Sequence, residues 1–344
     1  MSQSEDWRAK NVRRMNRYHA WRAARAKPAL GFVSQPEPKS IGSFARGRQL
    51  IGGNFLFAGY LVEAQNTSIW DIDAPAQGFV EEIHGFAWLD DLAAVGDYNA
   101  RHRAQDWIKE WMDRYAGGKG PGWTPDLTGR RLIRWIHHAL FFLSGQEADV
   151  SNAFYKTLGQ QTIFLSRRWQ TASPGLPRFE ALTGLIYAGL SLVGMEEHVA
   201  PAVKALAQEC ESEIDDEGGI PTRNPEELLE VFTLLTWAAA ALSEAGKIAD
   251  EAHLAAIERI APTLRALRHS DGGLARFHGG GRGMEGRLDR ALASFRLLDG
   301  SRNVTASANA DRNSNDGEVN TLPSNAARRN RSQSSEPSCQ PKPR

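Results

Sequence analysis

The chain has 344 residues, 41% of them hydrophobic, and its 41 Lys and Arg residues balance its 41 Asp and Glu residues. Such a chain can bury the core of one large or two smaller domains. A formal net charge of zero argues against a nucleic-acid binder, which needs a basic face to neutralise phosphates. The two cysteines are too few and too far apart for a disulfide framework or a thiolate metal site. We therefore expect no metal and no other cofactor.

The sequence also bears on membranes and export. No apolar stretch approaches the ~18 to 20 residues that span a bilayer, and the charged N-terminus has no apolar signal segment. We therefore expect no integral membrane segment. The compartment stays open, since the sequence by itself indicates a cytoplasmic protein and an exported protein is the alternative.

Residues 1–40 are predicted to form a basic N-terminal arm and linker. Between Arg8 and Lys27 there are eight basic residues and no acidic one. Apolar residues recur there at every third position, as on one face of a short helix, namely Val12, Met15, Tyr18 and Trp21. One interpretation is contact with a membrane surface or a polyanion. The other is a helix that packs this stripe on the domain while its arginines stay in water.

Residues 41–270 are predicted to form a helical domain. Residues 41–73 suit short strands or turns, and apolar residues then recur at helical spacing in about eight segments. These segments are 79–89, 107–115, 128–143, 150–169, 177–192, 197–213, 225–242 and 251–267. Short connections force consecutive helices to run antiparallel, so we expect a mainly α fold made of a curved array of helical hairpins. No sequence repeat of fixed period is visible.

The C-terminal part changes in character. Residues 271–278 alternate like a short strand and lead into a glycine-rich loop. From 294 to 344 the sequence is polar, without apolar periodicity, and is predicted to be a disordered tail. Because the junction is abrupt, we interpret this tail as the product of a truncation or frame-shift.

Several side chains are candidates for binding a sugar chain. Large aromatics at helical spacing usually pack in a core, whereas Trp123 stands beside Gly122 in a loop and is predicted to be an exposed stacking platform. Arg131 and Arg134, with His138, suit a cationic strip for a carboxylated or sulfated substrate. A solvated helix face explains this strip equally well.

Two further segments offer catalytic groups. Asn224 and Pro225 predict a helix start with Glu227 three residues after the cap, as in a capping box, so a structural role competes with a catalytic one for Glu227. His278 could act as a general base with Arg276 and Arg282 as charge partners, and Arg282 is also a candidate for binding the substrate. The alternative for His278 is a turn at the end of a strand.

Six segments, in this order, resemble the bacterial heparinase II/III-like family. They are Lys39–Leu50, Gly53–Tyr60, His84–Leu89, Thr128–Trp135, Gly218–Pro225 and Leu274–Arg282. The resemblance implies an incomplete (α/α) toroid over 41–270, and the start of a β-sandwich domain over 271–293. It also implies a polysaccharide lyase that cleaves uronic-acid-containing glycans by β-elimination.

The site residues that this resemblance implies are partly replaced here. In lyases of this type an Asn, often followed by His, neutralises the uronate, and a Tyr serves as acid or base. Leu176 and Pro177 stand in the first place and Glu227 in the second. The substitutes that we predict are Arg178 or Arg223 for neutralisation, His278 as base and Glu227 as acid.

Two functions remain open. The first is a lyase-type protein acting on an acidic polysaccharide, with this truncated chain inactive. The second is a non-catalytic glycan-binding or envelope-associated helical scaffold.

Overall fold

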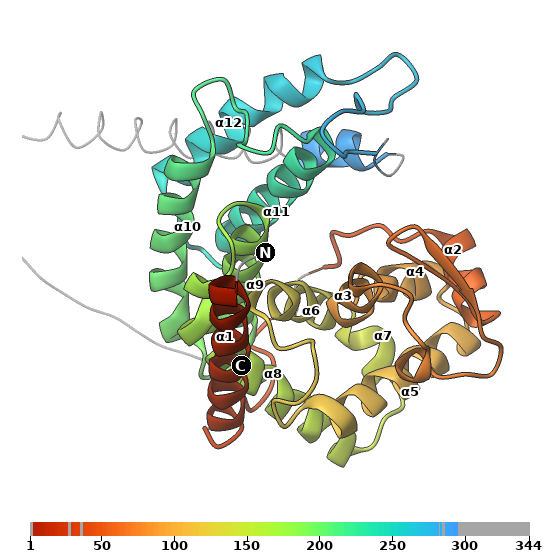
Figure 1. The fold of residues 1–344 in the computed structure, drawn as a ribbon. Coiled ribbons are helices and arrows are strands. Elements are labelled where there is room, and N and C mark those ends of the chain that lie inside the picture. The colour runs from red at the N-terminus through yellow and green to blue at the C-terminus, as the bar shows by residue number, and fades with distance from the viewer. Residues whose placement is uncertain (1–2, 27–28, 35–36, 282, 284–285, 295–344) are drawn as a thin grey trace, which may run out of the picture. The chain divides into compact units, whose positions relative to one another are not determined.

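The computed structural model describes residues 3–26, 29–34, 37–281, 283 and 286–294. This part of the chain is mainly α and forms an incomplete (α/α) toroid of antiparallel helical hairpins, as predicted (Figure 1). Its helices are α1 (Gln3–Ala23), α2 (Phe44–Ile51), α3 (Gln77–Gly85), α4 (Trp88–Val95), α5 (Tyr98–Tyr115), α6 (Pro125–His137), α7 (Ala139–Leu143), α8 (Ala148–Arg168), α9 (Leu176–Ser191), α10 (Val199–Glu213), α11 (Pro225–Glu244) and α12 (Glu251–Ala266).

Helices α6, α9 and α11 form the inner layer and run in the same direction. Near their N-terminal ends Arg130 on α6 pairs with Glu180 on α9, and near their other ends His137 packs against both Tyr187 and Trp237. Helices α8 and α10 make the return connections on the outside. Equivalent positions on successive inner helices are 50 residues apart. The hairpins therefore repeat in structure although the residue types at equivalent positions differ, which is why no period is visible in the sequence.

Glycines allow the first two inner helices to touch. A Cβ atom on Gly184 would lie 2.5 Å from the Cα of Gly129, and one on Gly129 would lie 2.2 Å from the carbonyl oxygen of Glu180. Only glycine permits backbones to approach this closely.

Two predicted helices are each broken in the structure. The segment predicted as one helix over 79–89 is split at Phe86, a fully buried residue in the left-handed region with φ of 62°. The segment 128–143 is split at His138, which ends α6 and precedes α7. Tertiary packing overrides the local period at both points. The second break places His138 within hydrogen-bond distance of Asp90 on α4.

Residues 41–73 contain the short strands that were predicted. Strands β1 (Asn54–Phe57) and β2 (Tyr60–Glu63) form an antiparallel hairpin. Phe55 packs against Trp107 and Phe57 against Phe79. Trp107 is buried, as expected for an aromatic residue at helical spacing.

The β segment predicted near 271–278 is present as one antiparallel bridge between Arg268 and Leu274. Residues 287–294 are helical, so Ser294, the first residue of the predicted tail, belongs to a helix. The rest of that tail, 295–344, lies outside the described residues. The assignment of 271–293 to the start of a β-sandwich stays a prediction.

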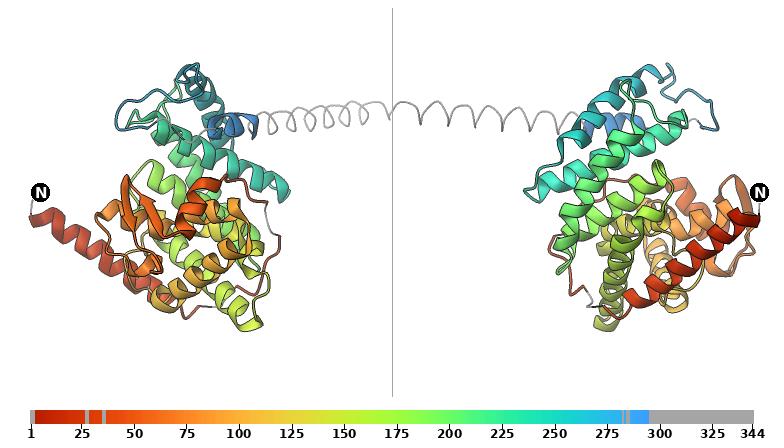
Figure 2. Two further views of the ribbon diagram at one scale, coloured as in Figure 1. Left: turned by 90° about the vertical axis from the view of Figure 1, so that its right-hand side faces the viewer. Right: turned by 60° about the vertical axis from the view of Figure 1, so that its left-hand side comes forward.

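Helix α1 lies on the outside of the helical array (Figure 2). It packs on α8 through small and polar residues: Ala20 and Ala23 are buried, and Asn16 accepts a hydrogen bond of 2.8 Å from Arg168. The stripe that begins at Val12 and ends at Trp21 is 38% to 49% exposed. The expectation that this stripe packs on the domain is therefore wrong, because alanines make the closer contact.

Candidate functional site

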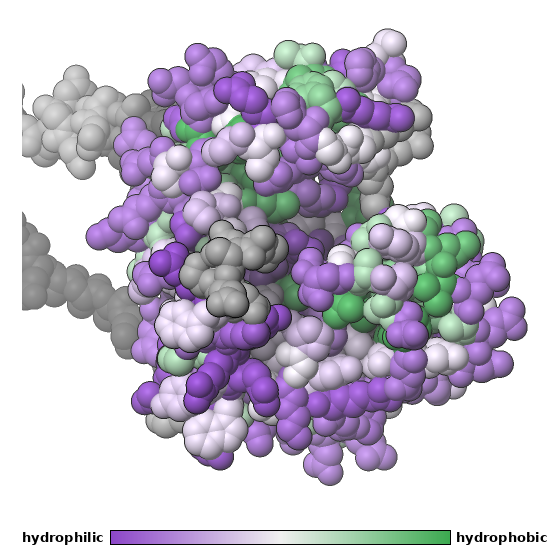
Figure 3. Space-filling view, in the orientation of Figure 1, coloured by the Kyte–Doolittle hydropathy of each residue, from purple (hydrophilic) through white to green (hydrophobic). Residues whose placement is uncertain are grey.

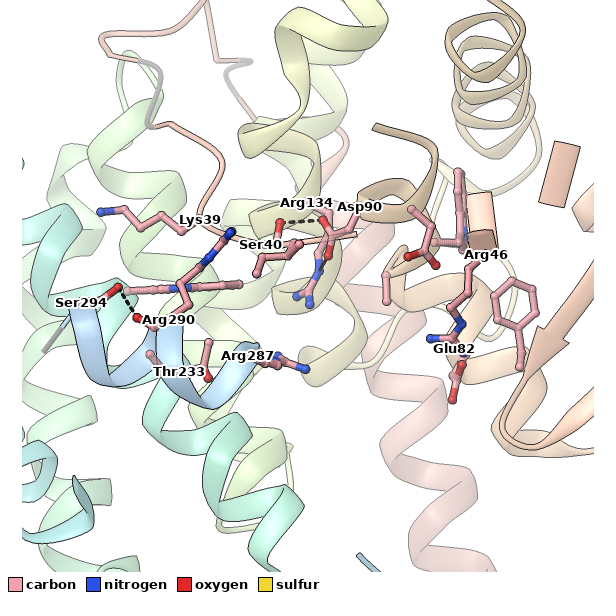
Figure 4. A pocket seen from close by; sticks show the side chains of 17 residues that line it. Lys39, Ser40, Arg46, Glu82, Asp90, Arg134, Thr233, Arg287, Arg290 and Ser294 are labelled. Carbon is pink, nitrogen blue, oxygen red and sulfur yellow. Dashed lines mark hydrogen bonds and ion pairs between the residues drawn. The ribbon is translucent and has the colours of Figure 1, made fainter. Parts of the chain in front are cut away.

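A groove lies between the N-terminal helices α2 to α4 and the C-terminal elements α11 and 287–294 (Figures 3 and 4). Five cationic and three acidic side chains line it, and we call it the basic groove. They are Lys39, Arg46, Arg134, Arg287 and Arg290, with Glu82, Asp90 and Asp91. In Figure 4, Arg46 and Glu82 lie on one side, Arg287 and Arg290 on the other, and Arg134 between them.

Asp90 is the centre of a buried polar network at the floor of this groove. Its Oδ1 accepts hydrogen bonds of 2.7 Å from Ser40 Oγ and 2.7 Å from His138 Nε2, and its Oδ2 is 3.5 Å from Arg134 Nε. Burial opposes ionisation of Asp90, but the His138 hydrogen bond and the Arg134 charge outweigh it and lower its pKa to about 2. Asp90 is thus held as a carboxylate.

The neighbouring Asp91 has the opposite behaviour. Its Oδ1 accepts a hydrogen bond of 2.7 Å from the backbone N–H of Ser43, just before α2. Burial nevertheless raises the pKa of Asp91 to about 6. Two adjacent carboxyl groups with pKa values on either side of the ordinary one are typical of sites that hold or transfer protons.

Two of the groove arginines remain available to a ligand. Lys39 pairs with Glu244 at 2.6 Å and Arg287 pairs with Glu230. Within the described residues, Arg46 and Arg290 take part in no ion pair, and both are exposed. They can therefore form bidentate contacts with a carboxylate or sulfate without breaking an internal pair.

Sequence reasoning missed most of this groove, including Arg46, Asp90, Asp91 and Arg290. The signal was present, because the segments Lys39–Leu50 and His84–Leu89 carry the family resemblance and meet here. Their approach depends on glycine, since a Cβ atom on Gly42 would lie 1.8 Å from the backbone oxygen of Asp90.

Of the predicted cationic strip, Arg134 lines the groove and Arg131 does not. Arg131 is fully buried, with Nε donating to Gln161 Oε1 at 2.6 Å and Nη1 donating to the carbonyl oxygens of His84 and Gly122. Its guanidinium lies 4.2 Å from the ring centroid of Trp111. Burial lowers the pKa of Arg131 to about 9. Its expected contact with substrate is wrong, because α6 is an inner helix packed on nearly all sides.

Trp123 is likewise not an exposed platform. It is 2% exposed, and its Nε1 donates a hydrogen bond of 2.8 Å to the carbonyl oxygen of Tyr115. The loop folds back over the end of α5, so the indole completes the aromatic core instead of facing solvent.

Two of the predicted catalytic residues, Arg223 and Glu227, lie at the start of α11, outside the groove lining. The cap predicted at Asn224 is confirmed, with Oδ1 accepting from the N–H groups of Glu226 and Glu227. The loop that carries His278 reaches the same place, since Gly281 N–H donates to Glu226 Oε2 at 2.7 Å. Arg223 and His278 are both exposed and in the left-handed region. The catalytic roles of Arg223, Glu227 and His278 stay predictions.

Arg178, one of the two remaining predicted residues, does not line the groove. Arg178, near the start of α9, pairs with Glu209 on α10 at 2.9 Å and also donates to the carbonyl oxygen of Ala172. Arg282 lies outside the described residues.

Among the described residues, no cluster of His, Cys, Asp and Glu is arranged to hold a metal ion. In the same part of the chain, no helix has the length and apolar character needed to cross a membrane.

The geometry can be compared with known proteins. No family model matches the chain. Its fold is similar to that of solved heparin and heparan sulfate lyases. Heparinase III aligns with a TM-score of 0.54 and 13% identity, over 73% of this chain and 43% of that one. Heparan sulfate lyase HepC from Pedobacter heparinus aligns with a TM-score of 0.50 and 14% identity, over 76% and 45%. The chain thus has the helical toroid of these lyases.

A relative found by sequence comparison is named for its localisation with FtsZ and not as a lyase. FtsZ-localized protein C of Caulobacter vibrioides (strain NA1000 / CB15N) is 30% identical over 283 residues, which are 80% of this chain and 47% of the relative. The chain therefore spans about half the length of this relative.

Proposed function

We propose that the basic groove binds an acidic, uronic-acid-containing glycan and that this chain does not cleave it. The observation that carries the proposal is the placement of Arg46 and Arg290 on opposite sides of the groove, neither in an ion pair with a described residue. A polyanion lying between them would meet a guanidinium on each side. The lyase-like fold supports a glycan as that polyanion.

The chemistry of β-elimination explains why turnover is not expected. The reaction needs a neutralised uronate carboxylate, a base for the C5 proton and an acid for the leaving oxygen. The groove supplies arginines for the first task and Asp91 as one proton-exchanging group. Its described lining contains no Tyr and no His. Glu227 lies in the first turn of α11, and the loop that carries His278 reaches that turn through Gly281. Neutralisation is therefore provided without a complete acid and base pair.

The test combines binding and turnover on the full chain. Titration calorimetry with heparan sulfate, chondroitin sulfate, alginate and polygalacturonate should show saturable binding to at least one, without new ultraviolet absorbance from unsaturated uronate ends. The double variant Arg46→Gln/Arg290→Gln should bind at least tenfold more weakly, because two charge-assisted contacts are lost. The control Arg167→Gln/Arg265→Gln removes two exposed charges elsewhere and should keep the affinity. Binding to none of the four glycans would refute the groove proposal, and new absorbance would refute its inactivity.

We also propose that α1 attaches the protein to an anionic surface, which would make it an envelope-associated scaffold. The aromatic residues Trp7, Tyr18 and Trp21 are 66%, 47% and 49% exposed, and the surface over α1 is mostly strongly hydrophilic in Figure 3. Arg25 stacks over Trp21 at 3.5 Å. A helix with exposed aromatics among arginines suits the interface of an anionic membrane. The curated relative, named for its localisation with FtsZ, supports a place for this chain near the division machinery.

Imaging tests this second role. A fluorescent fusion of the full chain should co-localise with FtsZ, and the triple variant Trp7→Ser/Tyr18→Ser/Trp21→Ser should become diffuse. Three other exposed apolar residues, Leu30, Leu140 and Ile248, give a matched control when changed to Ser. A diffuse parent protein, or equal loss in both triple variants, would contradict the role of α1.

A further inference from the structure

A second basic groove lies between α1 and the segment 117–124. We call it the arm groove. Four basic side chains of α1 line it, together with Gln77 and residues of the segment, and its described lining holds no acidic side chain. The basic residues are Lys10, Arg13, Arg14 and Arg17. These side chains concentrate positive charge in a concave site.

The walls of the arm groove are held in a fixed relation. Gly118, with φ of 83°, brings the segment against α1, where a Cβ atom would lie 3.0 Å from both Ala20 Cβ and the backbone nitrogen of Trp21. On its other side α1 is tied to α8, because Gln160 Nε2 donates to the carbonyl oxygen of Ala20 at 3.0 Å. The arginines one to two turns earlier on α1 are thus presented by an anchored helix.

Two helix N-termini border the same groove. Helix α3 begins at Gln77 and α6 begins at Pro125, directly after Thr124. Neither N-cap residue, Ala76 or Thr124, makes a side-chain capping bond, and the buried Oγ1 of Thr124 has no hydrogen-bond partner. Helix N-termini carry partial positive charge and favour anions. Their dipoles therefore add to the field of the α1 side chains.

We propose that the arm groove binds the phosphate of an anionic phospholipid headgroup. Arginine forks suit phosphate oxygens. Arg14 and Arg17 stand four residues before Tyr18 and Trp21, so the phosphate-binding side chains and the exposed aromatics are neighbours on one helix. In a bilayer, aromatic residues of this kind lie at the level of the headgroups. The inference rests on the surface contact proposed above for α1 and names its ligand.

Glycerol phosphate, a soluble headgroup fragment, tests the groove itself. Titration calorimetry of the full chain should show saturable binding, at least tenfold weaker in Arg13→Gln/Arg17→Gln. The matched control Arg8→Gln/Arg22→Gln removes two exposed arginines of the same helix that do not line the groove, and it should bind as the parent does. No saturable binding, or equal loss in both variants, would overturn the proposal.

Vesicle sedimentation tests the lipid as the source of the phosphate. Vesicles of phosphatidylcholine containing phosphatidylglycerol should bind the parent, and pure phosphatidylcholine should not. The groove variant should lose more affinity than the control, which loses only the diffuse attraction of two charges, about thirtyfold. Vesicle binding with equal loss in both variants would refute the groove and leave the surface contact of α1 standing. Glycerol phosphate binding without vesicle binding would refute the lipid assignment and the surface contact together.

Discussion

In the basic groove three carboxylates stand among five cationic side chains, whereas the described lining of the arm groove holds four cationic side chains and no carboxylate. The first is built around the buried polar network of Asp90, which we call the hub. In it Asp90 is hydrogen-bonded to Ser40 and His138. The second is lined on one side by α1 and on the other by the segment 117–124 and Gln77. Buried compensated charges fix geometry and proton occupancy, whereas exposed charges attract at a distance and are weakened by salt. The same residue types thus serve two kinds of recognition.

The largest effect is expected from breaking the hub. Asp90→Ala should destabilise the protein by about 3 to 5 kcal/mol, because Arg134 and His138 lose a buried partner. Chemical denaturation measures this, with Asp113→Asn, an exposed partner of Lys109, as the control expected to cost under about 1 kcal/mol. Because the folded-state pKa of Asp90 is depressed to about 2 from 3.8, its stabilisation is present above pH 3.8 and is lost as the pH falls through about 2. Equal losses of stability in the two variants would show that the buried network around Asp90 contributes no more than an exposed ion pair.

A smaller loss of stability is expected at Arg131, which the sequence predicted to bind substrate and which the structure buries. Arg131→Met should cost roughly 3 kcal/mol, because Gln161 and two backbone carbonyl groups lose their donors. At temperatures where the variant is still folded, its glycan affinity should equal that of the parent. A selective loss of glycan binding in the folded variant would show that Arg131 belongs to the site after all.

The third effect has the opposite sign. Asp91 has a raised folded-state pKa of about 6, so its contribution is fully present below pH 3.8 and is lost as the pH rises through about 6. At neutral pH the ionisation of Asp91 therefore costs the folded state roughly 3 kcal/mol. A neutral amide removes this cost but accepts a weaker hydrogen bond from the N–H of Ser43. Asp91→Asn should therefore stabilise the protein by about 2 kcal/mol at pH 7 and by almost nothing at pH 4. Denaturation curves with parallel pH profiles for variant and parent would contradict this.

The smallest effect on stability is expected from salt, which sharpens the contrast between the two grooves. Raising the ionic strength from about 0.05 to about 0.5 M shortens the screening length severalfold. The free energy of unfolding should change by less than about 1 kcal/mol, since the hub is buried, whereas vesicle binding through α1 should fall at least tenfold. Vesicle binding that resists salt would mean that the aromatic residues, and not the arginines, dominate the contact.

The sequence predicted the helical architecture well, because hydrophobic spacing and the cap at Asn224 are local signals. It misplaced Arg131, because local spacing cannot tell an inner helix from an outer one, and only the inner position buries a charged side chain. It misplaced Trp123, because no local signal shows that its loop folds back over the end of α5. It also missed Asp90 and Asp91. Their carboxyl groups become unusual only when residues 40–43, almost 50 positions earlier in the chain, are folded against them.

The 50-residue spacing of the inner helices has a mechanical consequence. In an array of this kind each hairpin gains most of its support from the hairpins before and after it. A ring that does not close has a last member, and within the described toroid that member is α12, which rests on α10 and α11. Fraying should begin there, so amide exchange should be faster in α12 than in α9. A partner that binds to this open end would therefore stabilise the whole array.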